Sequence, residues 1–523
     1  MTPVHQCKKG DAHNIFLIFL ERSLPFDNFF AQLIVLQPAL NMQELGAESL
    51  ESDMLTMVKN YFSEFKVLKT ASKEFWLVNA MVFFDGLAYF SMMNILSIYL
   101  TKNCGFSDFD SGKWIGIYTL LITAFIFGVG AICDTVGIKR SFSVGLGILI
   151  ITRSIFAVTP FFVKDQGLLQ IIVISSMIAM SFGTAFMTPI FNTAMRRFTT
   201  KENRSTGFNV YYLIMNIGAI FSGFLVTDGL RTLFGEINGN LAIMLVGMLM
   251  NLCAFMAIMF INENNYADPS EKVEVKIGKR PLAIFLEVWK ESAFQKLVVF
   301  LVLTIGVRLV FTHQFLVMPK YYTRVMQGDF ELGFANSINP IIIVVGLIVL
   351  IPIINKYNTF KMIVLGMAIS AFSLVIMALP IEWTLAIPGI HNLDQAYTFI
   401  IFAQIIVFAL GELIFSPRFS EYTAMIAPKD KVASYMSLAS LPMFIAKPIN
   451  GFVSGLLISL YSYDGIRAKI DTGNVAYNNS PEFMWFIYFL LALMSPIGVV
   501  MMKKYLRSSD EAAPVADDKS QVC

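Results

Sequence analysis

Charged side chains are scarce in this chain: only 15% of its 523 residues are Asp, Glu, Lys or Arg, and the net charge is +2. The positive residues form no basic block, which argues against a nucleic acid partner. The five cysteines show no C-x-x-C or Cys-to-His spacing, so neither a disulfide framework nor a metal site is expected. The chain also lacks the G-x-x-x-x-G-K-S/T loop that binds ATP phosphates, and no cofactor is expected.

Apolar residues dominate the composition instead. They make up 56% of the chain, and the mean hydropathy of +0.65 is too high for a protein surface in water. Windows of about 20 apolar residues predict twelve membrane-spanning helices. The sequence therefore indicates an all-α integral membrane protein with spans near residues 75–100, 112–133, 141–162, 168–194, 206–228, 240–262, 296–318, 333–354, 360–380, 397–425, 432–460 and 483–503.

A polar connection divides these spans into two sets of six. Six helices on each side of one pathway is the layout of many secondary transporters. We therefore expect five parts: an N-terminal cytoplasmic segment (1–74), an N-terminal six-helix bundle (75–262), a cytoplasmic linker with an amphipathic helix (263–295), a C-terminal six-helix bundle (296–503) and a cytoplasmic tail (504–523).

The N-terminal segment is not expected to be a signal peptide, because its apolar run at 15–20 is short and is followed by charged residues. Met54 and Met57 directly precede an amphipathic segment at 58–73. We take them as alternative starts of translation, with the upstream residues an artefact of gene calling.

Lys and Arg are more frequent on the loops that share a side with the N-terminus than on the opposite loops. Such residues are retained on the cytoplasmic side of a membrane. We therefore expect a multi-pass protein of the cell inner membrane with both termini in the cytoplasm.

Several polar residues lie inside the predicted spans, where a charge is costly unless it faces water or a partner. Asp85 and Tyr89 are four residues apart and share a helix face. The residues predicted to form a cavity for substrate and protons are Asp85, Tyr89, Arg153, Asn216, Arg308, His313, Glu412 and Lys447.

The charged members of this set allow more than one interpretation. Asp85 can carry a proton across the membrane, or it can form a structural ion pair with Arg153. Lys447 can be the counter-ion of Glu412. Alternatively Lys447, Arg153 and Arg308 hold an anionic group of the substrate.

The remaining members are also ambiguous. His313 can titrate near neutral pH, but a lone histidine on a Phe-rich helix is often a packing residue. Asn216 can line the cavity or hydrogen-bond a neighbouring helix.

The loop between the second and third spans carries a gating motif. Residues 130–140 read GAICDTVGIKR, which resembles the G-x-x-x-D-x-x-G-x-R/K-R/K loop of the major facilitator superfamily, with Thr135 replacing the usual basic residue. The resemblance implies a charge cluster that holds one of two states. The alternative is that its basic residues only anchor the loop on the cytoplasmic side. The gating residues are Gly130, Asp134, Gly137, Lys139 and Arg140.

Three further segments resemble the proton-dependent oligopeptide transporters within that superfamily. Residues 208–220 are similar to F-x-x-x-Y-x-x-x-N-x-G-S/A, 411–417 to G-E-L-x-x-S-P, and 337–340 to S-L/I-N-P. This resemblance implies the major facilitator fold and proton-coupled uptake of di- or tripeptides.

Two departures from the family pattern bear on the substrate. The first-span pattern E-x-x-E-R-F-x-Y-Y corresponds to residues 82–90, which keep one acid and lack the arginine. The fourth-span lysine before proline corresponds to Thr188. In the family these basic groups are tied to proton coupling and to the peptide carboxylate, so the scaffold can be shared while the substrate differs.

Three hypotheses remain open. The first is a monomeric, proton-coupled importer of small peptides or related solutes, embedded in the lipid bilayer. The second is a transporter of another small solute or organic anion by antiport. The third is a substrate-sensing membrane receptor. An enzyme is not expected, because no nucleophile and base pair or metal cluster is legible in the loops.

Overall fold

The computed structural model describes residues 65–200, 202–265, 267, 291–327, 330–349, 354, 357–426 and 441–506. In this part of the chain all regular elements are helices. Most of the predicted N-terminal segment, the amphipathic helix of the linker and most of the tail lie outside the described residues. The division into five parts therefore stays a prediction.

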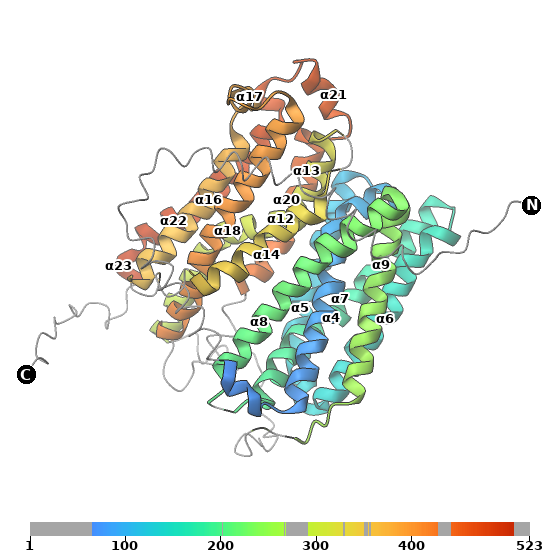
Figure 1. Ribbon diagram of the computed structural model, residues 1–523, viewed down its shortest axis with the longest axis vertical. Coiled ribbons are helices and arrows are strands. Elements are labelled where there is room, and N and C mark those ends of the chain that lie inside the picture. Colours follow the sequence, from blue (N-terminus) through green and yellow to red (C-terminus); the bar gives the residue numbers. More distant parts are fainter. Residues whose placement is uncertain are drawn as a thin grey trace, which may run out of the picture. The chain divides into compact units, whose positions relative to one another are not determined.

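The first half of the fold is one group of long helices (Figure 1). α6 packs against α7 and α9, and α4 packs against α8 and α9. The elements are η2 (Phe65–Thr70), α4 (Lys73–Ile98), η3 (Tyr99–Asn103), α5 (Asp108–Val136), α6 (Ile138–Phe162), α7 (Gln166–Arg197), α8 (Arg204–Phe221), η4 (Ser222–Asp228) and α9 (Gly229–Met259).

The second half forms the other group in Figure 1. α16 packs against α18 and α22, and α12 packs against α20 and α22. The elements are α11 (Ser292–Leu303), α12 (Ile305–Leu316), α13 (Met318–Val325), α14 (Leu332–Val349), α16 (Thr359–Ala378), α17 (Ile381–Leu385), α18 (Leu393–Ile426), α20 (Leu441–Tyr461), α21 (Ile466–Asp471), η6 (Tyr477–Asn479), α22 (Pro481–Met501) and α23 (Lys503–Leu506).

Polar residues fix where several of these helices begin. The Ser72 hydroxyl accepts a hydrogen bond from the Phe75 N–H at 3.2 Å, and the Asp165 carboxylate accepts one from Leu168 at 2.7 Å. These caps satisfy backbone donors that have no partner inside the helix. The helices therefore start where the polar loops between the apolar runs end.

Each predicted span overlaps at least one helix of the described residues, although 350–353 of one span and 432–440 of another lie outside those residues. By length and composition, eight of these helices can cross a membrane, or nine if α11 and α12, which are bent by 45°, count as one. One candidate runs from Thr206 to Met259, but Gly235 has a left-handed φ of 74° and divides it into the two spans expected there. Large apolar side chains such as Ile151, Phe372 and Met494 are exposed on the outside, as lipid contact requires.

The two halves meet closely at one end, where glycines face each other. A Cβ atom added to Gly112 of α5 would lie 2.4 Å from the Cα atom of Gly455 of α20. Gly116 and Gly451 face each other in the same way, with a Cβ on Gly451 2.5 Å from the Cα atom of Gly116. Small residues let helix backbones approach closely inside a membrane. The contact between α5 and α20 depends on them.

Candidate functional site

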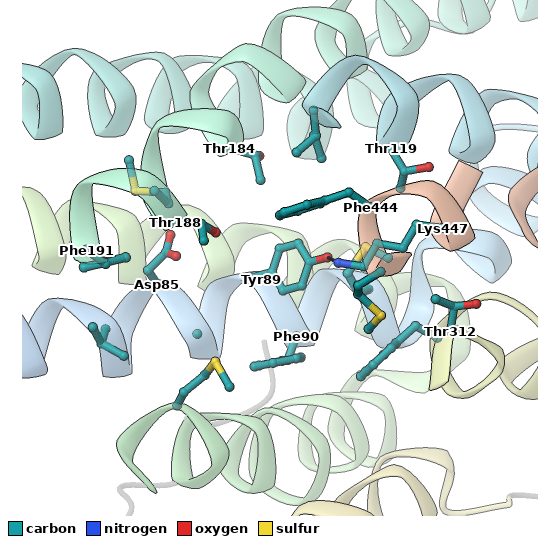
Figure 2. A pocket seen from close by; sticks show the side chains of 18 of the residues that line it. Asp85, Tyr89, Phe90, Thr119, Thr184, Thr188, Phe191, Thr312, Phe444 and Lys447 are labelled. Carbon is teal, nitrogen blue, oxygen red and sulfur yellow. Dashed lines mark hydrogen bonds between the residues drawn. The ribbon is translucent and has the colours of Figure 1, made fainter. Parts of the chain in front are cut away.

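A cavity of about 310 Å³ lies between the two halves. Helices α4, α5, α7 and α8 line it on one side, and α12 and α20 line it on the other (Figure 2). Its volume is at the lower end of the range of small-molecule sites, roughly 300–1,000 Å³. Most of the wall is apolar, and the polar residues in it are Asp85, Tyr89, Thr119, Thr184, Thr188, Tyr211, Thr312 and Lys447.

Lys447 and Tyr89 join the two halves across the cavity. The Lys447 ammonium donates a hydrogen bond to the Tyr89 hydroxyl at 3.0 Å and lies 5.4 Å from the centre of the Tyr89 ring. Figure 2 shows the two side chains pointing toward each other, with Asp85 further along α4. Of the eight predicted cavity residues, these three line the cavity.

Pro448, which follows this lysine, removes one backbone hydrogen bond from α20. Proline has no N–H, so the Phe444 carbonyl one turn earlier loses its partner within the helix. The Thr123 hydroxyl of α5 lies 3.0 Å from this carbonyl and can donate to it from the other half. A side chain of the other half thus supplies the donor that Pro448 lacks.

Asp85 is supported from behind by two buried side chains of the same half. Asn251 donates a hydrogen bond to its carboxylate at 3.4 Å. Arg153, only 3% exposed, attracts it electrostatically but donates to the Ala88 carbonyl at 2.7 Å. No N···O distance of 4.0 Å or less joins Asp85 to Arg153 in the described part of the chain. Arg153 compensates the charge of Asp85 from outside the cavity wall.

Glu412 belongs to a second polar cluster within the C-terminal half. Asn339 donates to the Glu412 carboxylate at 3.0 Å and to the Gln314 side-chain carbonyl at 3.1 Å. Arg308 attracts Glu412 electrostatically. Its guanidinium lies 4.8–4.9 Å from the ring centres of Phe311, Phe415 and Phe419. This cluster does not contribute to the lining of the cavity.

His313 and Asn216 also lie away from the cavity lining. His313 is 1% exposed and packs between aromatic rings, with its ring centre 4.1 Å from that of Tyr488 and 5.7 Å from that of Trp485. Asn216 donates to the Tyr212 carbonyl of its own helix at 2.8 Å. The contacts of His313 are those of a packing residue, whereas the hydrogen bond of Asn216 goes to its own helix and not to a neighbouring one.

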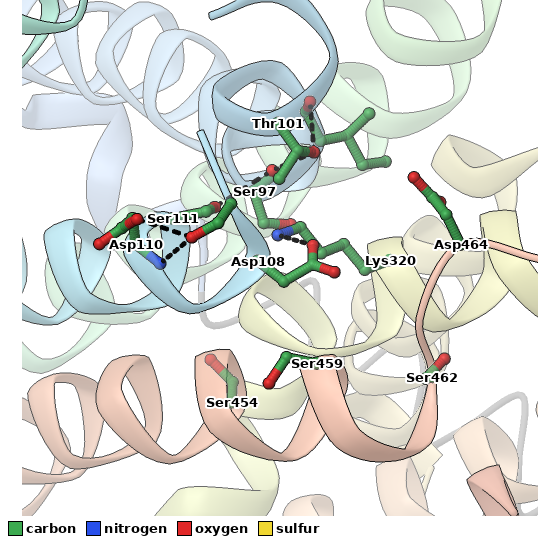
Figure 3. A network of polar contacts seen from close by, with 12 residues as sticks. Ser97, Thr101, Asp108, Asp110, Ser111, Lys320, Ser454, Ser459, Ser462 and Asp464 are labelled. Atoms are coloured by element: carbon green, nitrogen blue, oxygen red, sulfur yellow. Dashed lines mark hydrogen bonds and ion pairs between the residues drawn. The ribbon is translucent and has the colours of Figure 1, made fainter. Parts of the chain in front are cut away.

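A charge cluster closes the end of the cavity region near the glycine contacts. We use this name for Lys102, Asp108, Lys320, Arg324 and Asp464. Asp108 at the start of α5 lies 3.0 Å from the Lys320 ammonium of α13 (Figure 3). It also lies 2.7 Å from the Arg324 guanidinium of the same helix. Asp464 lies 3.2 Å from Arg324 and 3.5 Å from Lys102. The cluster therefore joins the two halves.

Sequence analysis missed this cluster because its residues flank the spans, where charges are common. Lys320 lies on α13, beyond the end of the bent span α11–α12. Burial lowers the pKa of Lys320 to about 8, although the Asp108 carboxylate opposes the shift. The buried position of the lysine, which a sequence does not reveal, distinguishes it from a surface charge.

Asp228 makes a second contact between the halves. Its carboxylate accepts hydrogen bonds from the backbone N–H groups of Gly333 at 2.7 Å and Phe334 at 2.5 Å. These are unpaired donors of the first turn of α14, and a helix N-terminus favours a negative charge. Asp228 therefore caps a helix of the opposite half. Its position at the edge of the predicted span 206–228 was the only sequence signal.

The gating motif lies at the junction of α5 and α6. Gly137 has a left-handed φ of 94°. The Lys139 ammonium donates to the Met259 carbonyl at 2.9 Å and to the Ile261 carbonyl at 3.1 Å. The backbone N–H of Lys139 donates to the Glu263 carboxylate at 3.0 Å. Arg140 is exposed, and for Gly130 and Asp134 in α5 the structure describes the helical backbone alone.

Comparisons with known proteins agree with this architecture. The family model described as Major Facilitator Superfamily matches residues 78–441. The "Dipeptide and tripeptide permease A" of Salmonella typhi is 27% identical over 186 residues, which cover 35% of this chain and 35% of the relative. The permease of the same name from Escherichia coli (strain K12) is 26% identical with the same coverage. The chain thus matches only about a third of the length of these curated relatives.

Solved structures match over a larger part of the chain. A POT family transporter in complex with a thioalcohol-conjugated peptide has a TM-score of 0.62 at 16% identity, covering 83% of this chain and 96% of that one. A POT family transporter in complex with 5-aminolevulinic acid has a TM-score of 0.61 at 15% identity with the same coverage. At this identity the likeness concerns the fold, and it confirms the predicted all-α fold of twelve helices in two bundles.

Proposed function

Because the chain belongs to the Major Facilitator Superfamily, we propose that it is a secondary active transporter that takes up small peptides or related solutes together with protons. The observation that carries this proposal is the cavity, whose wall is shared by both halves and which lies beside their closed end. A site between two helix bundles that rock against each other can face each side of the membrane in turn. The named relatives, a permease and transporters, support transport and not catalysis.

We place both termini in the cytoplasm of the cell membrane, which puts the charge cluster on the outer side. The outer end is then closed, and uptake requires the cluster and the Asp228 contact to separate. The monomer is the transporting unit, because its two halves supply the whole lining. At the opposite end the gating residues Gly130, Asp134, Gly137, Lys139 and Arg140 control closure.

Protons enter through the two acids inside the spans. Asp85 lies in the cavity wall, and Glu412 lies in the polar cluster with Arg308. Protonation removes the attraction of each acid for its neighbouring arginine. The free energies of the outward-facing and inward-facing states then change by different amounts, which is what coupling requires.

A second candidate is antiport of an organic anion. The observation that favours it is Thr188 in the cavity wall, at the place where the peptide transporters carry a lysine. A transporter without that lysine and without the first-span arginine needs another way to bind its substrate. The two candidates differ in how flux responds to a proton gradient.

Uptake into proteoliposomes separates these candidates. We expect labelled Ala-Ala to accumulate when the outside is acidic, and Glu412→Gln and Asp85→Asn to lose this accumulation. Glu74→Gln is the matched control, because Glu74 is a buried acid near the start of α4 that accepts a hydrogen bond from Asn265 and does not line the cavity. Accumulation driven by an acidic inside would favour antiport. Ligand-dependent thermal stabilisation without any flux would favour a receptor.

A further inference from the structure

Lys447 is a cation in the cavity wall without an acidic partner. In the described residues its polar contact is the Tyr89 hydroxyl, and no carboxylate lies within 4.0 Å. An ammonium group inside a membrane protein is costly unless a negative group or water compensates it. A tyrosine hydroxyl supplies only a dipole. The ammonium of Lys447 is therefore open to a negatively charged group in the cavity.

The charged residues around the cavity also leave one positive charge uncompensated. Asp85 is the acid in the wall, and Arg153 behind it already compensates its charge. Glu412 does not line the cavity and has Arg308 and Asn339 as neighbours. One positive charge, that of Lys447, is left over, and it favours an anionic ligand.

The donors at this point suit a carboxylate. A lysine ammonium has three N–H donors, and Lys447 uses one of them on Tyr89. The Tyr89 hydroxyl accepts that bond and keeps its own O–H for another acceptor. Phe90, Phe315 and Phe444 form apolar walls beside the pair. Figure 2 shows Phe90 and Phe444 on opposite sides of Tyr89.

We propose that Lys447 and Tyr89 bind the carboxylate of the transported solute, whose apolar part lies against Phe90, Phe315 and Phe444. This assignment rests on the proposed function, and it takes the cation that binds the carboxylate from the C-terminal half and the hydroxyl from the N-terminal half. The carboxylate can belong to a small peptide or to a free organic acid. The cavity of about 310 Å³ limits either to a small molecule.

The test measures binding of three probes to the purified full chain by isothermal titration calorimetry. The probes are Ala-Ala, N-acetyl-Ala-Ala and Ala-Ala amide. We expect wild type to bind Ala-Ala at least about tenfold more tightly than the amide, because the amide has no charged acceptor. In Lys447→Met this ratio falls to about one, and in Tyr89→Phe it falls part of the way. Lys469→Met, on the exposed helix α21, is the matched control and keeps the ratio.

Lys447→Arg is the second variant, used in case Lys447→Met does not fold. It restores a cation, so the ratio between acid and amide is retained. Retained binding of N-acetyl-Ala-Ala identifies a general organic acid site, and its loss identifies a site for zwitterionic peptides; both support the assignment. An unchanged ratio in Lys447→Met, equal binding of acid and amide to wild type, or no binding of any probe overturns it.

The two experiments distinguish failure of the carboxylate site from failure of the proposed transport. If proton-driven flux is absent but the ratio depends on Lys447, the carboxylate site stands and the proposed coupling fails. If flux is present but the ratio does not depend on Lys447, the transporter stands and the site assignment fails.

Discussion

The Asp108 carboxylate and the Arg324 guanidinium lie 2.7 Å apart and belong to opposite halves of the molecule. Lys320 adds a second cation at 3.0 Å from the same carboxylate oxygen. The side chains of both cations are almost fully buried, at 3% and 4% exposure. Asp108 thus contacts two buried cations of the other half, and the closed end depends on it.

Replacing Asp108 by Asn should open this end. Removal of one partner of a buried ion pair costs about 3–5 kcal/mol, because the other charge is left uncompensated. Here Lys320 would be left without its acid and Arg324 with only the more exposed Asp464. We expect a cysteine introduced at Ser111, which is buried, to react faster with a membrane-impermeant maleimide in Asp108→Asn.

Asp110→Asn is the control for this prediction. Asp110 lies on the same turn and accepts a hydrogen bond from Ser107 at 2.7 Å, within its own half. Its replacement should leave the labelling rate at Ser111 unchanged. Equal labelling of wild type and Asp108→Asn would show that the charge cluster does not hold the halves together.

The pH dependence of closure should reflect Lys320. Its pKa is about 8 in the closed state because burial disfavours its charged form, and about 10.4 when it is solvated in an open state. Between these values the open state binds more protons than the closed one, so raising the pH favours closure. Below pH 8 Lys320 is protonated in both states and contributes no pH dependence.

Spin labels at Phe109 and Ala468, which are exposed residues of opposite halves, can measure this equilibrium. We expect the population with the short distance to grow between pH 8 and pH 10, and Lys320→Gln to abolish that growth. A growth of equal size in Lys320→Gln would assign the effect to another group.

A larger side chain at the contact between α5 and α20 should prevent the outer end from closing. A side chain at Gly112 would collide with the backbone of Gly455, since even its Cβ atom would lie 2.4 Å from the Cα atom. We expect Gly112→Leu to fold, to hold the outer end open and to lose uptake in proteoliposomes. Gly147→Leu is the control, because no atom lies within 4 Å of a Cβ atom at that position. Normal uptake by Gly112→Leu would exclude a requirement for this contact.

Much of the fold could be predicted from the sequence, because a bilayer restricts the backbone to helices of a set length. Gly235 illustrates the remaining difficulty. The helical stretch from Thr206 to Met259 is one candidate span by length and hydropathy, and the turn at this glycine separates it into two. The apolar runs on each side predicted both helices correctly.

The site was harder to predict than the fold. Asp85 and Tyr89 share a face of one helix, so their joint position in the cavity follows from spacing. The partner of Tyr89 is Lys447, 358 residues away in the chain, and the charge of this lysine gave no indication of which group it contacts. The sequence offers Glu412 as the acid that Lys447 compensates, but in the described residues Glu412 accepts a hydrogen bond from Asn339. Contacts between halves depend on tertiary packing that helical periodicity does not contain.

Loss of the cap on α14 should weaken the closed state. Asp228→Ala leaves the N–H groups of Gly333 and Phe334 without their acceptor, at a cost of about 1–3 kcal/mol. We expect faster maleimide labelling of a cysteine at Ser111 in this variant, as in Asp108→Asn. Asp228→Asn keeps one acceptor oxygen and should lie between Asp228→Ala and wild type. Identical labelling in all three proteins would contradict a closing role for this cap.

The bridge between Thr123 and Phe444 allows a double-mutant test of how the cavity wall is held. The Thr123 hydroxyl lies 2.9 Å from the Thr119 carbonyl of its own helix and 3.0 Å from the Phe444 carbonyl, which Pro448 leaves without a helical donor. Thr123→Val should therefore lower the melting temperature, since a buried acceptor without a partner costs about 1–3 kcal/mol.

Pro448→Ala supplies an N–H that can bond the Phe444 carbonyl within α20, so the loss of the Thr123 hydroxyl should cost less in that background. The coupling is read from melting temperatures of the two single variants and the double variant. Thr193→Val is the control, because the Thr193 hydroxyl donates to the Pro189 carbonyl of its own helix. If Thr123→Val lowers the melting temperature equally with Pro448 and with Ala at that position, the carbonyl released by the proline is not what Thr123 satisfies. Thr123 then contributes to the contact between α5 and α20 through packing and not through this hydrogen bond.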